Sequence, residues 1–141
     1  MIALVCDHGG FELMKSVRAF LDSKEIAYKD FGSFTPDSCD YPVVAVPAVD
    51  AICSGECDKG IFICGTGIGI SIAANRTRSI RAALCTNTFM AQMARAHNDA
   101  NVLVLGGRVV SEPLACEIVE VFLSASFSGE DRHKFRVDLL S

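Results

Sequence analysis

The segment from Gly60 to Asn75 constrains the fold more than any other part of the chain. It begins with the apolar run Ile61-Phe62-Ile63 and the thiol of Cys64, passes through three glycines at alternate positions, and ends in Ser-Ile-Ala-Ala-Asn. This pattern predicts a buried strand that leads through a glycine-rich turn into a helix. Free backbone amides at a helix start form a cradle that accepts anions. The thiol of Cys64 is expected at the lip of that cradle.

Short apolar runs alternate with helical patterns along the rest of the chain. Strands are predicted at residues 2–6, 26–31, 61–64, 81–85 and 102–105. Helices are predicted at residues 11–21, 43–53, from 69 onward, and at 88–97, 112–125 and 131–140, with Pro47 opposing the second of these. Apolar strands that alternate with helices are typical of a parallel sheet covered on both faces. We therefore expect one α/β domain over residues 1–141.

Composition excludes several classes of function. Half of the 141 residues are hydrophobic and the net charge is −4, which argues against a general nucleic-acid or anionic-membrane surface. The N-terminal apolar run is too short for a signal peptide, and no uncharged stretch reaches the length of a membrane span. Seven cysteines without a C-x-x-C pair indicate a reducing, cytoplasmic setting, with neither a disulfide framework nor a zinc site.

The glycines do not form a nucleotide-binding motif. They run G-x-G-x-G after the third predicted strand, and no acidic residue follows between Gly65 and His97, where a dinucleotide fingerprint needs one. The spacing of Gly55 and Gly60 is that of a P-loop, but Ile61 and Phe62 stand where lysine and a hydroxyl residue are required. A smaller anion is the better ligand. Ligands of such sheets bind beyond the carboxyl ends of the strands, at Asp7-His8, Cys64–Gly69 and Gly106–Arg108.

Several motifs together resemble one family. They are Asp7-His8-Gly9-Gly10, Asp40-Tyr41-Pro42, the run from Cys64 to Asn75, His97-Asn98-Asp99-Ala100-Asn101, Gly107-Arg108-Val109-Val110 and Arg132-His133-x-x-Arg136. Over nearly its whole length the chain is similar to the ribose-5-phosphate isomerase B family, which also includes galactose-6-phosphate isomerase subunits.

The resemblance implies an aldose–ketose isomerase that interconverts ribose 5-phosphate and ribulose 5-phosphate without metal or cofactor, in the non-oxidative pentose phosphate pathway. It also implies a three-layer α/β/α Rossmann-like sandwich with a five-stranded parallel sheet. The expected assembly is a homodimer with active sites at the subunit interface, with a tetramer as the alternative. No nucleic acid or membrane partner is expected.

The family uses either a cysteine or a glutamate as the base that moves a proton between C2 and C1 of the open sugar. The glutamate position corresponds to Ile70, which cannot act as a base, so the resemblance assigns the base to Cys64. Amides of the 65–69 loop (Gly65, Gly67, Ile68 and Gly69) are then expected to face the enediolate oxygen. Thr66 is expected to position the sugar hydroxyls.

The remaining roles also follow from the resemblance. His97 would open the furanose ring, since imidazole both donates and accepts protons near pH 7. Asp7 and Asn98 would hold sugar hydroxyls, and Tyr41 is a further sugar contact. The phosphate would be bound by arginines and a histidine, namely Arg132, Arg136, Arg108 and His8.

Simpler roles compete with these assignments. Asp7 could only cap the first helix, His97 could only interact with a helix C-terminus, and Arg132 and Arg136 could form a solvated surface pair. Cys6 and Cys85 are expected to be inert buried thiols. Ser71 and Asn75 have no assigned role. A hexose-6-phosphate isomerase, for galactose or allose 6-phosphate, and a non-catalytic sugar-phosphate-binding module are the alternative functions.

Overall fold

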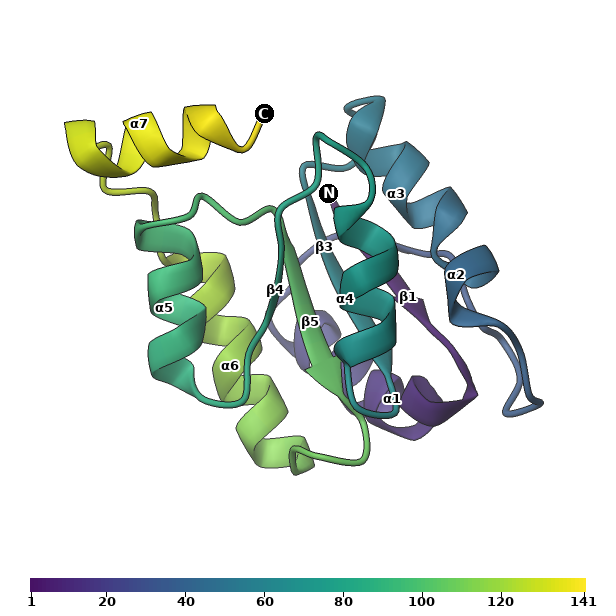
Figure 1. Ribbon diagram of the computed structural model, residues 1–141. Helices are drawn as coiled ribbons and strands as arrows, with labels where there is room; N and C mark the ends of the chain where they lie inside the picture. Colours follow the sequence, from purple (N-terminus) through teal and green to yellow (C-terminus); the bar gives the residue numbers. More distant parts are fainter.

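The computed structural model describes residues 1–141 and has at its centre a sheet of five parallel strands (Figure 1). In the order of the sheet the strands are β2 (Tyr28–Asp30), β1 (Ile2–Cys6), β3 (Lys59–Cys64), β5 (Val102–Gly106) and β4 (Ala82–Leu84). The predicted parallel α/β sandwich is confirmed, although β2 and β4 are shorter than the runs predicted at 26–31 and 81–85. Both are edge strands, so each has only one neighbour to pair with.

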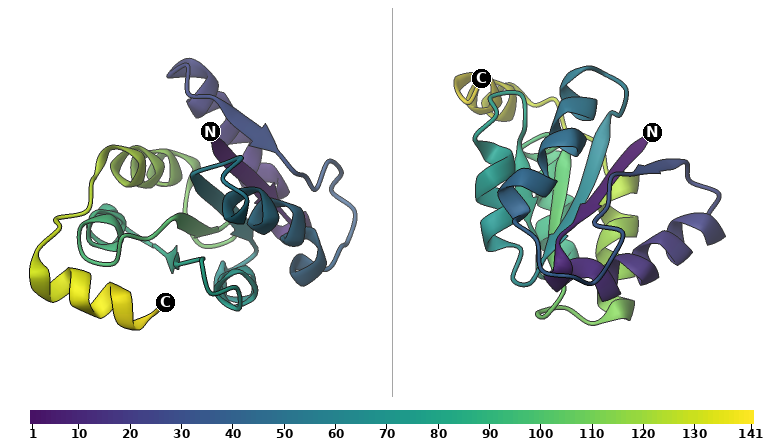
Figure 2. Two further views of the ribbon diagram at one scale, coloured as in Figure 1. Left: turned by 90° about the horizontal axis from the view of Figure 1, so that it is seen from above. Right: turned by 90° about the vertical axis from the view of Figure 1, so that its right-hand side faces the viewer.

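Helices cover both faces of the sheet, which gives three layers (Figure 2). One layer contains α1 (Phe11–Ser23), α5 (Thr88–Ala96) and α6 (Glu112–Ser124), and the other contains α2 (Tyr41–Val44), α3 (Val46–Cys53) and α4 (Ile68–Asn75). A short 3-10 turn, η1 (His8–Gly10), joins β1 to α1, and the last helix is α7 (Asp131–Leu139). Figures 1 and 2 show α7 on the outside of the molecule, beyond the end of α5. No helix is long and apolar enough to cross a membrane.

The central strands are apolar throughout because both of their faces are buried. In β3, Ile61 and Ile63 pack with α1 and α6, whereas Phe62 and Cys64 point into the cluster formed with α3 and α4. Neighbouring side chains of a strand point to opposite faces, which explains this division. The thiol of Cys64 therefore lies on the α4 side of the sheet, where the glycine turn also leads.

The single helix predicted over residues 43–53 is wrong, because the structure divides this segment into α2 and α3. The break lies at Ala45, whose amide still donates to the carbonyl of Tyr41 at 3.0 Å. Two residues later Pro47 has no amide hydrogen to donate to Val43, so a continuous helix would lack that hydrogen bond. Pro47 instead occupies the first turn of α3, where no such bond is needed.

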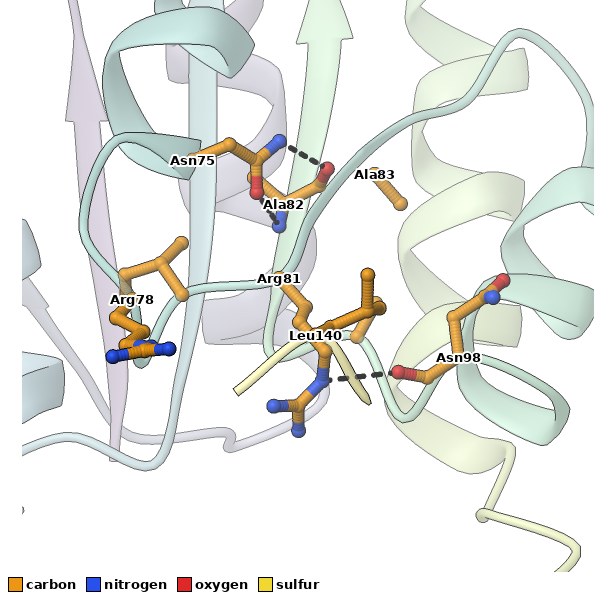
Figure 3. Close-up of a pocket in the computed structure, with 9 residues that line it drawn as sticks. Asn75, Arg78, Arg81, Ala82, Ala83, Asn98 and Leu140 are labelled. Atoms are coloured by element: carbon orange, nitrogen blue, oxygen red, sulfur yellow. Dashed lines mark hydrogen bonds between the residues drawn. The ribbon is translucent and has the colours of Figure 1, made fainter. Parts of the chain in front are cut away.

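The side chain of Asn75 pairs with the free edge of β4 at Ala82. Its Nδ2 donates to the carbonyl of Ala82 at 2.9 Å, and its Oδ1 accepts from the amide of Ala82 at 2.8 Å (Figure 3). These two bonds imitate the pair that a neighbouring strand would make. The role left open for Asn75 by the sequence is therefore structural.

Candidate active site

The loops after β1, β3 and β5 meet at the carboxyl edge of the sheet and pack backbone against backbone. The Gly107 amide donates to the carbonyl of Cys64 at 2.8 Å, and the Arg108 amide donates to the carbonyl of Gly65 at 2.9 Å. A Cβ atom at Gly107 would lie only 2.5 Å from the carbonyl oxygen of Gly9. Side chains are therefore excluded from this junction, which leaves backbone amides as its surface.

A hollow of about 400 Å³ opens over this junction. Every residue that lines it was singled out from the sequence as a site residue: Asp7, Tyr41, Cys64, Gly65, Thr66, Ile68, Gly69 and Arg108. Parallel strands end at one edge, so residues that follow different strands converge there. This convergence is what the sequence pattern predicts.

Cys64 forms the inner wall of the hollow and is 5 % exposed. The amide of Gly67 donates to its sulfur at 3.2 Å. Gly67 adopts a φ of +81° and immediately precedes α4, so the turn directs its amide back toward the strand end. The sulfur of Cys64 thus faces both the hollow and the first turn of α4.

Asp7 caps the 3-10 turn η1 and also lines the hollow. Its Oδ1 accepts from the amides of Gly9 at 2.8 Å and Gly10 at 3.3 Å, as expected for a cap, and the side chain is buried at the wall of the hollow. The two roles assigned to Asp7 from the sequence are thus compatible. The ring of Tyr41, which also lines the hollow, lies so close to Gly69 that an added Cβ would be 2.6 Å from it.

The chain that supplies Cys64 also supplies the guanidinium group of Arg108 and the imidazole of His8. Arg108 lies over Gly65 and forms no ion pair within the chain. His8 accepts a hydrogen bond at Nδ1 from the amide of Cys39 at 3.3 Å, which assigns its proton to Nε2. Both groups therefore keep donors available for an anion.

The other predicted site residues lie at the opposite end of the sheet. Helix α5 runs from the carboxyl end of β4 back to the amino end of β5, so His97 and Asn98, which follow it, are at the amino edge. Helix α7, with Arg132 and Arg136, lies at that same end (Figure 1). The six residues of β3 separate the two edges by about 20 Å. One chain alone does not bring these residues to Cys64.

Asn98 lines a second hollow, also about 400 Å³, at the amino edge (Figure 3). Arg81 forms part of its wall and donates to the carbonyls of Asn98 at 3.0 Å and of Asp99 at 2.9 Å. Leu140, just after α7, also lines this hollow. The turn that carries His97 and Asn98 is therefore braced by Arg81.

Sequence reasoning missed His133, although it lies inside the Arg132-His133-x-x-Arg136 motif. Its ring stacks on that of His97, with centroids 4.0 Å apart and planes inclined by 11°. The neighbouring arginines are exposed; Arg132 pairs with Glu130 at 3.1 Å, and Arg136 forms no ion pair. A histidine between two exposed arginines was the available signal, but its stacking partner is remote in sequence.

A parallel α/β sandwich that presents a thiol beside backbone amides at its carboxyl edge is typical of proteins that bind or transform small molecules. Comparison with known proteins identifies the class more closely. The family described as Ribose/Galactose Isomerase matches residues 2–140. The chain belongs to this family and is an isomerase.

Individual relatives cover almost the whole chain. Ribose-5-phosphate isomerase B of Escherichia coli is 44 % identical over 140 residues, which are 99 % of this chain and 93 % of that protein. The 4-deoxy-4-sulfo-D-erythrose isomerase of a Clostridium species is 38 % identical, over 95 % of this chain and 84 % of that protein. The crystal structure of a Thermotoga maritima ribose 5-phosphate isomerase superposes with a TM-score of 0.96 at 49 % identity, covering 99 % and 95 % of the two chains.

Proposed function

We propose that this protein interconverts ribose 5-phosphate and ribulose 5-phosphate through an enediolate. The observation that carries the proposal is the Cys64 sulfur, held at 3.2 Å from the Gly67 amide on the wall of a hollow lined by further loop residues. The names of the Escherichia coli and Thermotoga maritima relatives support a five-carbon phosphate as the substrate.

The reaction moves one proton between carbons and one between oxygens. The Cys64 thiolate removes the proton from C2 of the open aldose and returns it to C1, while the proton of the C2 hydroxyl passes to O1. Negative charge develops on oxygen in between. The amides of Gly67 and Ile68 already donate to Cys64 and Thr66, so the remaining amides of the 65–69 loop are the ones that face that charge. One such donor typically contributes about 2.7–4 kcal/mol to the transition state. The Thr66 hydroxyl is at the rim of the hollow, where it can orient the sugar.

The phosphate and the closed ring need groups that one chain does not place near Cys64. We assign the phosphate to Arg108 and His8 from the chain that supplies Cys64, and to Arg132 and Arg136 from a second copy. The second copy also supplies His97, which opens the ring, and Asn98. Each active site of this homodimer is then shared between two chains.

Exposed apolar side chains support an association of this kind. Five of them lie on α2, α3 and α4, around or beside the hollow: Tyr41, Val43, Val46, Ile68 and Ile72. Helix α2 packs against both α4 and α3, so the helices that carry these residues are neighbours. Exposed apolar side chains gathered on neighbouring helices are typical of an interface.

A coupled spectrophotometric assay tests the substrate. We expect the highest kcat/KM with ribose 5-phosphate, compared with galactose 6-phosphate, allose 6-phosphate and 4-deoxy-4-sulfo-D-erythrose. A preference for a six-carbon phosphate or for the sulfonated tetrose would replace the proposed substrate but keep the reaction type. Tight binding of ribose 5-phosphate without turnover would instead indicate a non-catalytic binding module.

Mixing two inactive variants tests the shared site. Cys64→Ala and His97→Asn homodimers each lack one group in both sites. After subunit exchange, a mixed dimer has one site with both groups intact, so random mixing restores about a quarter of wild-type activity. No recovery after verified exchange would show that each site is built from one chain.

A further inference from the structure

The buried ring of His133 faces His97 and nothing in the proposed reaction uses it. Its side chain is 6 % exposed, and Nε2 is buried without a hydrogen-bond partner. The two imidazoles are nearly parallel, with centroids 4.0 Å apart. A buried polar nitrogen without a partner costs free energy, so a position that keeps it requires an explanation.

Two hydrogen bonds tie the connection that leads into α7 to the end of α5. The amide of Ser128 donates to the carbonyl of Ala96 at 3.0 Å, and Arg95 Nε donates to the carbonyl of Ala125 at 3.5 Å. The connection between α6 and α7 is thus tied to the last turn of α5. His133, in the first turn of α7, is placed on His97 by these contacts.

The face of α7 that carries His133 is its inner face. His133 and Val137, one turn apart, are the buried residues of this helix. Arg132 and Arg136 each precede one of them by a single position and are exposed. Any rotation of α7 that moves these guanidinium groups therefore also moves the ring that rests on His97.

We propose that His133 is a positioning residue for His97, whose ring it holds in one orientation with both nitrogens free at the edge. This inference rests on the proposed ring-opening role of His97. Ring opening takes the proton from the C1 hydroxyl and delivers a proton to the ring oxygen, as the bond between C1 and that oxygen breaks. The imidazole must therefore present its nitrogen edge to the sugar, and no group of the chain hydrogen-bonds either nitrogen of His97.

The charges around His133 keep it suited to this role. Burial lowers the pKa of His133, and His97, Arg132 and Arg136 lower it further, while Glu130 raises it. His133 is therefore neutral near pH 7. A neutral ring can pack against His97 without repelling a proton that His97 carries during the reaction.

Exchange between the anomers of ribose 5-phosphate reads out ring opening directly. The Cys64→Ser variant lacks the base for isomerisation but retains His97. Ring opening and reclosure can therefore be observed alone in this variant, and two-dimensional exchange NMR measures their rate. Within this background we compare His97→Asn, His133→Ala and His133→Phe. Phenylalanine keeps a flat ring against His97, whereas alanine removes it.

We expect His97→Asn to lower the exchange rate at saturating sugar about 100-fold. We expect His133→Ala to lower it about tenfold through misorientation of His97, and His133→Phe to restore it to within about threefold of the parent. Circular dichroism and the dissociation constant for ribose 5-phosphate are measured on each variant, to separate orientation from unfolding or loss of phosphate binding.

Three results overturn the inference. One is an unchanged exchange rate in the folded His133→Ala variant, and another is failure of His133→Phe to restore the rate. The third is equal exchange with and without His97, which removes the ring-opening role itself. The isomerase activity of the wild-type enzyme is measured separately, and it tests the proposed function independently of these three exchange results.

Discussion

The amide nitrogen of Gly67 lies 3.2 Å from the sulfur of Cys64 and donates a hydrogen bond to it. Gly67 can do so because it adopts a φ of +81°, which returns the backbone toward the end of β3 before α4 begins. A side chain at this position would collide with Leu84 and approach the Leu105 backbone. The middle of the three alternate glycines therefore serves to direct an amide at the thiol.

Replacement of Gly67 by alanine is expected to destabilise the fold and abolish activity. The left-handed conformation alone costs a residue with a Cβ about 1–2 kcal/mol, and the collision with Leu84 adds to this. Urea denaturation gives the loss in the free energy of unfolding. Gly55→Ala is the matched control, because Gly55 has a φ of +84° but no atom within 4 Å of an added Cβ. That control should lose stability through strain alone and keep full kcat; equal losses in both variants would contradict a special role for the turn.

Replacement of Cys64 by serine is expected to lower kcat at least about 1,000-fold, because a hydroxyl is far less acidic than a thiol and cannot act as the base. Binding of ribose 5-phosphate, measured by calorimetry, should change little. Cys53→Ser, at an exposed thiol outside the hollow, serves as the control and should be fully active. Turnover at the wild-type rate in Cys64→Ser would remove Cys64 from the mechanism.

The thiols should differ in their reaction with iodoacetamide near pH 8. Burial, with help from Asp30, raises the pKa of Cys6 to about 12, and burial raises that of Cys85 to about 11. Both thiols remain protonated in the folded protein and should resist alkylation. Cys64 lines the hollow, so bound sugar phosphate should slow its modification, whereas modification of exposed Cys53 should be unaffected. Peptide mass spectrometry measures alkylation at each cysteine separately. An equal rate of Cys64 alkylation with and without sugar phosphate would argue against the proposed binding mode.

His133 should make the fold less stable in mild acid. Its folded pKa is lowered by burial, so as the pH falls below the ordinary histidine pKa of about 6.5 the unfolded chain binds a proton that the folded chain does not. The free energy of unfolding should therefore decrease from about pH 7.5 to about pH 5.5, and His133→Phe should reduce that decrease. An identical pH dependence in the two proteins, measured by urea denaturation, would be inconsistent with this linkage.

Much of the fold follows from the sequence because its strongest signals are local. The run Ile61-Phe62-Ile63 has no polar alternation, and the structure buries it on both faces. The residues after β1, β3 and β5 could be placed at one edge from topology alone, and they form most of the wall of the first hollow. Tyr41 follows none of these strands and was expected there only from the family resemblance. Local signals fail where two effects compete, as at Pro47, which still occupies a helix but interrupts the one predicted across it.

Relationships between remote residues could not be predicted. The stacking of His97 on His133 depends on where the connection after α6 crosses the end of α5, and the sequence contains no pattern that encodes this crossing. The separation of Cys64 from His97 follows from strand direction, but it becomes clear only once α5 is known to return to the amino edge. The motifs therefore identify candidate residues, while the fold decides which of them one chain can bring together.

The clamp that Asn75 places on Ala82 has a consequence for how copies of this protein meet. A free edge strand offers unpaired amides and carbonyls to any other strand, and this is a common route to continuous sheets and aggregates. Here a single carboxamide already occupies both groups of Ala82. Growth of the sheet from one molecule into the next is therefore opposed at that residue of β4, so strand pairing through this edge is disfavoured as a route to assembly.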